Sequence, residues 1–178
     1  TLRGRNDNTI IINAHNCHPF QANDDISGCA LGIKLFQKLK KIKNRKFTYT
    51  LLIAPELYGP IFWLNKINKS RIKNLDYSIL LKSVGNNNSI KLQHSVIKNT
   101  EIDNSALRAL INSKEKYTTG NFRTIYGNDE IVFDSPGYNI HTISLTRSPF
   151  PEYHTDLDTP KIISQKKLSK TFSILKFI

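Results

Sequence analysis

Methionine is absent from this 178-residue sequence, and cysteine occurs only twice, as Cys17 and Cys29. A sequence without methionine, even at position 1, is expected to be a piece of a longer protein. Two cysteines cannot form the disulfide framework that staples small secreted domains, and they suit a reducing compartment. We therefore expect a cytoplasmic protein.

Long hydrophobic runs are also missing. A helix needs about 18 or more apolar residues to cross a bilayer, and the N-terminal residues show no secretory signal pattern. We therefore expect no membrane partner. Hydrophobic residues make up 39% and charged residues 22% of the sequence, as in an ordinary globular domain. The length fits a single domain over residues 1–178.

Acidic residues are scarce: 14 Asp and Glu stand against 26 Lys and Arg, which gives a formal net charge of +12. Such a balance can mark a surface for nucleic acid or an acidic substrate. However, the local lysine clusters at residues 38–46 and 161–170 fall in helical patterns and are typical of solvated faces. Because basic charge alone is weak evidence, we do not expect a nucleic-acid partner.

Strand and helix patterns alternate along the chain. Residues 9–14 form an apolar run typical of a buried parallel strand, and residues 26–42 follow with helical spacing. Further strands are expected at residues 47–54, 77–84, 90–96 and 141–146, and further helices at residues 60–67, 104–113 and 162–177. This rhythm predicts an α/β three-layer sandwich, in which a mostly parallel mixed sheet carries helices on both faces. Residues 90–96 are expected to form an edge strand.

Polar clusters follow three of these strands, at the sheet edge where α/β proteins place their sites. The first contains His15, Cys17, His18, Asp24 and Asp25. Zinc binds neutral imidazole, thiolate and carboxylate groups, so these side chains could converge on an ion if the segment between them turns. Alternatively, the aspartates only cap the next helix and the histidines are loop residues.

The other two clusters contain one residue each with suitable chemistry. Glu56 ends the second strand in an apolar stretch, where a carboxylate near a metal could take a proton from water. Taken alone, such a residue is more often a cap or a surface carboxylate. His154 lies near Asp156 and Asp158, either of which could accept its second ring N–H, although the same segment is good helix-entry chemistry.

Asp129 and Glu130 form an acidic pair in a glycine turn. They could hold a substrate ammonium group, or they could belong to a type I turn that opens a short helix. The sequence contains no Gly-rich phosphate loop, G-x-S-x-G elbow or H-E-x-x-H helix. Aspartates precede Ser27 and Gly28, which disfavours a serine hydrolase.

Taken in order, the clusters resemble the zinc aminopeptidase superfamily, which includes bacterial leucyl aminopeptidases, glutamate carboxypeptidase and glutaminyl cyclase. The likeness covers nearly the whole chain. It lies in the strand that ends at His15, the Asn-Asp-x-x-Ser-Gly-like residues 23–28, the Pro-Glu-Leu-Tyr-Gly residues 55–59, the acidic turn at 127–130 with Phe133 and the strand entry at 136–140, and the Tyr-His-Thr-x-x-Asp-Thr residues 153–159. The His-x-Cys-His-Pro and Pro-Glu-Tyr-His-Thr motifs look like those of aminopeptidase-like domains in multidomain bacterial proteins associated with polysaccharide biosynthesis.

The resemblance implies a role for individual residues. Asp24 matches the carboxylate that bridges the metals of two-zinc members, His154 matches a histidine ligand, and Glu56 matches the general base. Either His15 or His18 would complete the ligand set. Residues 55–57 contain no Glu-Glu pair, and residues 81–84 offer no aspartate. The resemblance therefore implies one Zn²⁺ ion, as in the cyclase branch.

The resulting prediction is a zinc-dependent hydrolase of aminopeptidase type. It would cleave the N-terminal peptide bond of a small peptide, or a related amide, by metal-activated water. The residues predicted to contact this substrate are Asp129, Glu130, Glu152, Tyr153 and Arg147. One alternative is a catalytically inactive aminopeptidase-like fold that binds a glycan or a protein partner in polysaccharide biosynthesis. Another is a single-zinc cyclase or acyltransferase, in which Glu56 shuttles a proton without water attack.

Overall fold

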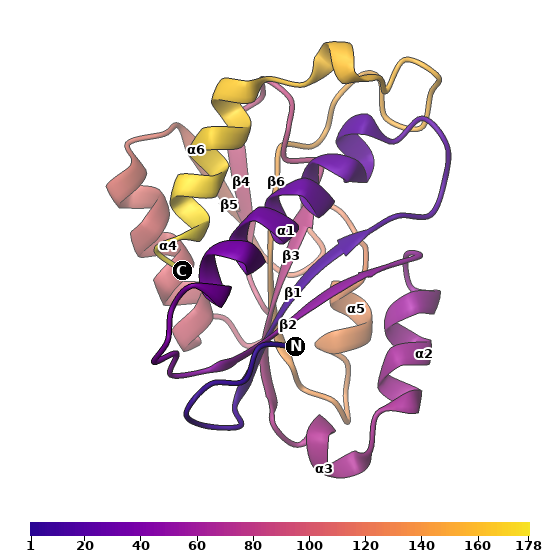
Figure 1. Cartoon of the computed structure of the whole chain (residues 1–178). Helices are drawn as coiled ribbons and strands as arrows, with labels where there is room; N and C mark the ends of the chain where they lie inside the picture. The colour runs from indigo at the N-terminus through magenta and orange to yellow at the C-terminus, as the bar shows by residue number, and fades with distance from the viewer.

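Six strands form one mixed sheet in the computed structural model, which describes residues 1–178 (Figure 1). The strands are β1 (Thr9–His15), β2 (Thr48–Ala54), β3 (Leu75–Lys82), β4 (Ile90–Gln93), β5 (Tyr117–Gly120) and β6 (His141–Thr146), in the order β2-β1-β3-β6-β4-β5. β1 is parallel to β2 and β3, and β3 is parallel to β6, whereas β4 runs antiparallel to β6. The carboxyl ends of β2, β1, β3 and β6 therefore lie along the same edge.

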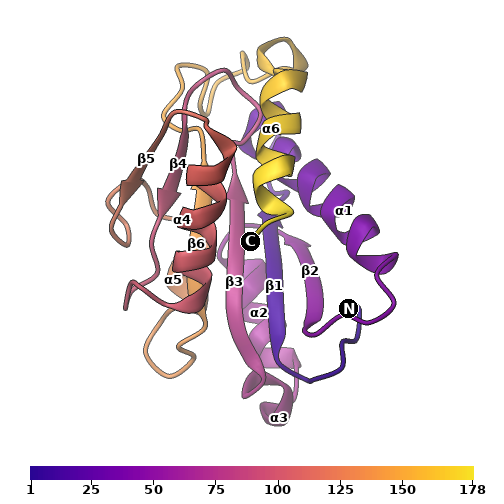
Figure 2. The same ribbon diagram turned by 90° about the vertical axis from the view of Figure 1, so that its left-hand side faces the viewer.

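Helices cover both faces of this sheet, as the two perpendicular views show (Figures 1 and 2). One layer contains α1 (Ser27–Lys40), α4 (Glu101–Ser113) and α6 (Gln165–Leu175). The other contains α2 (Tyr58–Lys66) and α5 (Glu130–Phe133), with the short α3 (Lys69–Ile72) leading into β3. A kinked turn (Ala22–Ile26), in which Asp24 and Asp25 have non-helical backbone angles, precedes α1, and a 3-10 turn (Pro160–Ile162) precedes α6.

Alternate side chains of β1 supply the two cores. Ile10 and Ile12 pack in the larger core beneath α1, α4 and α6, whereas Ile11 packs in the smaller core beneath α2 and α5. Because the strand is buried on both faces, it shows a continuous apolar run rather than an alternating pattern. This burial fixes the position of His15, which is the last residue of β1.

The predicted three-layer α/β architecture is confirmed, and one detail of it is wrong. Residues 90–96 were expected to form an edge strand, but β4 lies between β6 and β5, and β5 is the edge. β5 escapes detection because it is only four residues long, and its sequence, Tyr-Thr-Thr-Gly, contains no apolar alternation. The four-residue helices α3 and α5 are too short to show a helical period.

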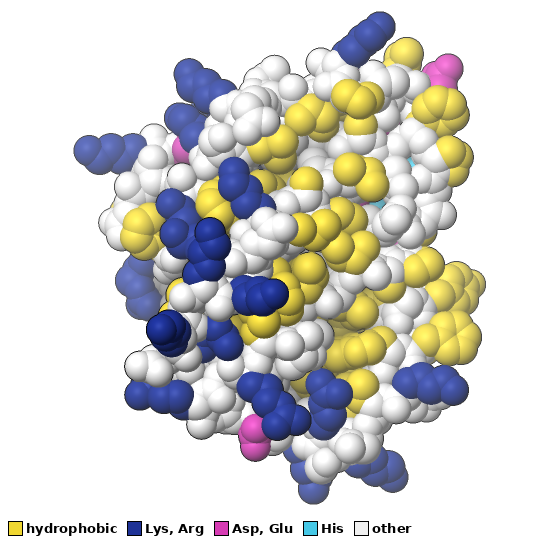
Figure 3. All heavy atoms as spheres, viewed as in Figure 1, with side chains coloured by type: hydrophobic (Ala, Val, Ile, Leu, Met, Phe, Trp, Pro, Cys, Tyr) yellow, Lys and Arg dark blue, Asp and Glu magenta, His cyan; other side chains and the backbone are white.

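The surface carries the positive charge in dispersed form. Figure 3 shows Lys and Arg side chains scattered over the helical layer of α1, α4 and α6, with few acidic groups among them. Lys34, Lys38 and Lys40 are exposed along α1, as expected for a solvated helix face. No helix is both long enough and apolar enough to cross a membrane.

Candidate active site

Four polar side chains come together at the carboxyl edge of the sheet, where loops gather at the upper right of Figure 1. His15 ends β1, Lys82 ends β3, and Glu56 lies just beyond β2. His154 comes from the segment between β6 and α6. The strand ends thus bring together residues that are distant in sequence, as the motif order predicted.

The carboxylate of Asp24 lies at the centre of this cluster and is completely buried. Its Oδ1 atom accepts a hydrogen bond from His15 Nε2 at 3.1 Å and lies 3.6 Å from Lys82 Nζ. Its Oδ2 atom faces two other histidines: His18 Nε2 at 3.6 Å and His154 Nε2 at 3.4 Å. Burial would raise the pKa of Asp24, but the hydrogen bond from His15 and the charge of Lys82 outweigh it and lower that pKa to about 2.

The Oδ2 side of Asp24 fits a divalent cation. His18 Nδ1 donates a hydrogen bond to the Pro19 carbonyl at 2.8 Å, which leaves Nε2 as the ring nitrogen that can offer a lone pair to a metal. That nitrogen and Asp24 Oδ2 are both buried without a hydrogen-bond partner. A lone pair and a carboxylate oxygen that face each other repel unless a cation lies between them. The ligand atoms of His18, Asp24 and His154 all lie within 4.8 Å of one another, and imidazole and carboxylate donors suit zinc.

The choice between His15 and His18, which the sequence left open, acquires a geometric basis. Both ring nitrogens of His15 are already engaged, Nε2 with Asp24 and Nδ1 with Cys17 Sγ at 3.3 Å. His18 faces the same carboxylate oxygen as His154. His15, Cys17 and His18 also lie within 4.8 Å of one another, but burial raises the pKa of the Cys17 thiol, which disfavours the thiolate that a metal requires.

The segment at residues 23–28 holds Asp24 in place without using its carboxylate. Neither aspartate is the N-cap of α1, which is Ile26; Asp25 Oδ1 accepts from the Gly28 amide in the first turn at 3.1 Å. Asp158 accepts from the backbone amides of Asn23 and Asp24 at 2.7 and 2.9 Å. Two aspartates were expected as possible hydrogen-bond acceptors for His154. Asp158 instead supports the backbone at Asp24, and Asp156 is exposed.

Glu56 lies at the rim of the cluster, with its side chain 26% exposed. Its Oε2 atom is 3.9 Å from His15 Nε2 and 3.8 Å from Lys82 Nζ. The next amide, that of Leu57, donates to Asp129 Oδ1 at 2.7 Å. Asn13 donates to the other oxygen of Asp129, also at 2.7 Å. Asp129 therefore supports the turn that carries Glu56.

The remaining predicted substrate contacts are distributed unevenly. Tyr153 is 40% exposed, and its ring stacks on His154 with centroids 3.8 Å apart. Glu152, the preceding residue, is partly exposed. Glu130 is buried; its Oε1 accepts from the Asn128 amide and its Oε2 has no partner, and burial raises its pKa to about 7. Arg147 is buried under α6, where it donates to Val84 O at 3.2 Å and Thr171 Oγ1 at 3.0 Å, so its guanidinium is not brought to the cluster.

Lys82 is the cluster residue that sequence reasoning missed. It ends β3 directly after the apolar run Ile79–Leu81, and all four residues are buried. A lysine at the end of such a strand must find an anion or reach water, because an unpaired buried charge is costly. The buried lysine could therefore have been predicted from the sequence, whereas the resemblance considers only the missing aspartate in residues 81–84.

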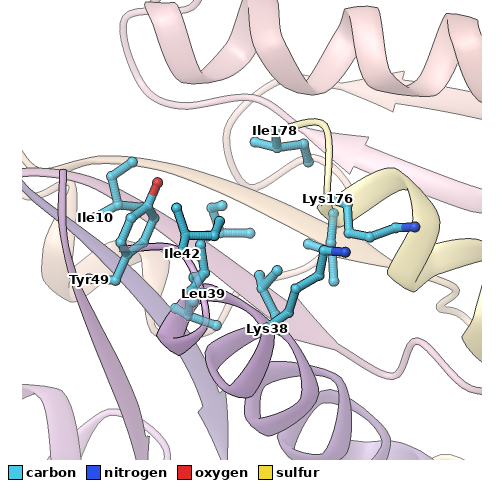
Figure 4. Close-up of a pocket in the computed structure, with 11 residues that line it drawn as sticks. Ile10, Lys38, Leu39, Ile42, Tyr49, Lys176 and Ile178 are labelled. Atoms are coloured by element: carbon cyan, nitrogen blue, oxygen red, sulfur yellow. The ribbon is translucent and has the colours of Figure 1, made fainter. Parts of the chain in front are cut away.

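A separate apolar pocket of about 100 Å³ lies near the amino ends of β1 and β2, away from the cluster (Figure 4). Leu39 of α1 and Ile42, just beyond that helix, line it together with Tyr49 of β2 and Ile178 at the end of the chain. None of the cluster residues borders it. Its lining is apolar apart from Lys38 and Lys176.

Comparisons with known proteins show the family and the fold of this chain. A family model described as "Domain of unknown function (DUF4910)" matches residues 1–178. A curated protein of Clostridium acetobutylicum, provisionally described as a polysaccharide biosynthesis protein with an aminopeptidase-like domain, is 31% identical over 173 residues, which cover 96% of this chain and 39% of that protein. A crystal structure of a provisionally assigned peptidase from the same organism has a TM-score of 0.91 and 30% identity, over 98% of this chain and 41% of that one.

A more distant likeness extends to a zinc aminopeptidase of Bacillus subtilis. The TM-score is 0.78 at 17% identity, over 94% of this chain and 44% of that chain. At this identity the likeness concerns the fold alone. The chain spans about two fifths of the length of the Clostridium proteins that it matches.

Proposed function

The chain belongs to the family described as "Domain of unknown function (DUF4910)", and we propose that it forms a one-zinc hydrolase of aminopeptidase type. The bond cleaved is an N-terminal peptide bond or a related amide. The resemblance predicted from the motif order is confirmed in the aminopeptidase-like fold and in the description of the Clostridium relative. Because the chain spans only part of that relative, the substrate and partners of the whole protein belong to the proposal.

One observation carries the proposal: Asp24 Oδ2 is buried without a hydrogen-bond partner and faces the Nε2 atoms of His18 and His154. In the proposed site these three residues hold one zinc ion. When bound, zinc supplies a Lewis acid that polarises a carbonyl group and makes water more acidic. His15 orients Asp24 from its other oxygen, as supporting residues commonly do around metal ligands.

Glu56 is proposed as the general base. Its carboxylate lies at the rim of the cluster and is partly exposed, so water and substrate can reach it. It would take a proton from the attacking water and pass that proton to the leaving amine. The contact of Lys82 with Glu56 Oε2 and the bond of Asp129 to the Leu57 amide support a fixed position for this carboxylate.

Tyr153 and Glu152 are proposed to line the substrate site, because their side chains are partly exposed next to His154. The structure supports a different role for the other predicted contacts. All three are buried: Asp129, Glu130 and Arg147. Asp129 accepts from Asn13 and the Leu57 amide, Glu130 accepts from the Asn128 amide, and Arg147 donates to the Val84 carbonyl. We propose that these three residues support the fold and do not contact the substrate.

The experiment combines metal analysis with an amide substrate. Purified chain should contain one zinc ion, and Asp24→Ala and His154→Ala should lose it. Release of amine from aminoacyl-anilides should fall about 100-fold or more in Glu56→Gln, as expected for the loss of a general base, while zinc is retained. Glu101→Gln removes an exposed acid on α4 and should change neither property.

Two results would count against the proposal, and they differ in meaning. A wild-type chain that never contains zinc would rule out the metal site. A zinc-loaded wild type that releases no amine from any aminoacyl substrate would instead favour the inactive fold that binds a glycan or a protein.

A further inference from the structure

Lys82 carries a fixed positive charge inside the cluster. We propose that its ammonium group occupies the position of a second cation on Asp24, so that the centre accepts one divalent ion and excludes another. The same ammonium positions Glu56. This inference rests on the proposed function, because it concerns the cation that faces the opposite side of the same carboxylate.

The surroundings of Lys82 Nζ are those of a cation site. It lies 3.6 Å from Asp24 Oδ1 and 3.8 Å from Glu56 Oε2, and its side chain is only 2% exposed. The ring centroids of Tyr126 and Tyr153 lie 5.6 and 5.4 Å away, within the range of cation–π attraction. Two carboxylates and two aromatic rings thus surround one ammonium group.

Asp24 divides its two oxygens between two kinds of neighbour. Oδ2 faces the imidazoles of His18 and His154, which can be metal ligands. Oδ1 faces Lys82 and the Nε2 atom of His15. A divalent ion on the Oδ1 side would lie against an ammonium that has no exit to water, and like charges at this range in a buried site repel strongly. The second cation position is therefore filled by the chain itself.

The backbone after Lys82 prevents the side chain from moving aside with its strand. Three consecutive amides are bound by the segment that carries Asp24, with distances of 2.8 to 3.0 Å: Ser83 to Asp25 Oδ1, Val84 to Ser27 Oγ, and Gly85 to Asn23 Oδ1. The end of β3 and the segment at residues 23–28 therefore form one unit. This unit fixes the separation of Lys82 from Asp24.

The group also stays charged. Asp24 Oδ1 lies 3.6 Å and Glu56 Oε2 3.8 Å from Lys82 Nζ, and opposite charges this close favour the ammonium form. A permanent cation beside Glu56 keeps the carboxylate in one place and needs no ion from solution. Lys82 thus acts through Glu56 and Asp24, as a positioning residue.

The test counts zinc ions per chain after dialysis against excess zinc. Wild type should bind one. Lys82→Asp replaces the cation by a metal ligand and should bind two zinc ions. Lys82→Met removes the charge and should bind a second zinc ion at a free zinc concentration at which wild type still binds only one. Lys82→Arg keeps the charge and should bind one. Lys166→Asp makes the same charge change on exposed α6 and should also bind one.

A second measurement separates positioning from packing. With an amide substrate, Lys82→Met should lower kcat at least tenfold while KM stays within twofold, and Lys82→Arg should recover part of kcat. Circular dichroism establishes whether each variant is folded. If Lys82→Asp does not fold, the zinc content of Lys82→Met decides the test.

Four outcomes are distinguishable. A single ion in folded Lys82→Asp and Lys82→Met would overturn the role of Lys82 and leave the proposed function standing. Two zinc ions in wild type would overturn both the role of Lys82 and the one-zinc count of the proposed function. One ion in wild type and two in the variants would support the role of Lys82. No zinc in wild type would overturn the proposed function, and this inference would fall with it.

Discussion

Asp158 accepts a hydrogen bond from the backbone amide of Asp24 at 2.9 Å, across 134 positions of sequence. Its second oxygen accepts from the Asn23 amide at 2.7 Å. One carboxylate therefore ties the segment that carries the central aspartate to the segment that carries His154. It contacts no proposed ligand atom, yet it determines how the two segments meet.

Asp158→Ala should therefore weaken zinc binding without removing a ligand. Loss of a supporting residue around a metal site typically costs 10- to 100-fold in affinity, and a loss of about that size is expected. Two buried amides lose their acceptor, so the free energy of unfolding should fall by about 1–3 kcal/mol. Chelator competition and urea denaturation measure the two effects. Asp156→Ala, an exposed neighbour, is the control, and equal zinc affinity in both variants would contradict the assigned role.

Gly59 is needed because the turn after β2 is tight. A Cβ atom at this position would lie 2.3 Å from the Cβ of Ala54, so the turn that carries Glu56 would have to shift. Gly59→Ala should lower stability by about 1–3 kcal/mol and lower kcat more than it changes zinc content. Thermal melts and amide hydrolysis are the measurements.

The double variant Ala54→Gly, Gly59→Ala provides the matched control. It removes the Cβ that clashes, so it should recover part of the lost stability relative to Gly59→Ala alone. If the two changes are additive, with no recovery, the clash is not the reason for the glycine.

Much of the fold could be predicted because long elements carry strong patterns. The apolar run of β1 and the helical spacing of α1 gave both their type and their bounds to within about two residues. Because parallel strands end at the same edge of a sheet, the sequence also predicts that Asp24, Glu56 and His154 lie at one edge. Short elements such as β5 carry too few residues for a period to appear.

Contacts between side chains were less predictable, because they depend on directions that spacing does not contain. His15 and His18 lie three positions apart, and only geometry assigns them to opposite oxygens of Asp24. The acidic character of Asp129 suggested a substrate contact, whereas its oxygens bind the Leu57 amide and Asn13. The resemblance does not predict Lys82, because it implies metal ligands and a lysine is not one.

Arg147→Lys tests whether the buried guanidinium is structural. Arg147 donates to the carbonyls of Val84 and Asn88 and to Thr171 Oγ1, and a single ammonium cannot reproduce this planar set of donors. Stability should fall by about 2 kcal/mol, while KM for an amide substrate stays unchanged well below the melting temperature. A raised KM in a variant of wild-type stability would instead restore the substrate contact predicted from sequence.

Glu130 gives the protein a pH-dependent stability that a glutamine would remove. Burial raises the pKa of Glu130 from 4.5 to about 7, and its Oε2 atom has no hydrogen-bond partner. Below about pH 4.5 the carboxyl is protonated in both the folded and the unfolded chain, so it has no effect. Between pH 4.5 and 7 the unfolded chain loses the proton first, and stability falls as pH rises. Above pH 7 the full penalty, about 3 kcal/mol, applies.

Glu130→Gln keeps an oxygen that can accept from the Asn128 amide, as Glu130 Oε1 does, but it cannot ionise. The difference in unfolding free energy between the variant and wild type should therefore grow in favour of the variant by about 3 kcal/mol from pH 4.5 to 8, and then stay level. Urea denaturation across this range measures it, and the comparison cancels all other titrating groups. Any constant offset reports how well the amide fits the cavity, whereas a difference independent of pH would show that Glu130 ionises normally in the folded chain.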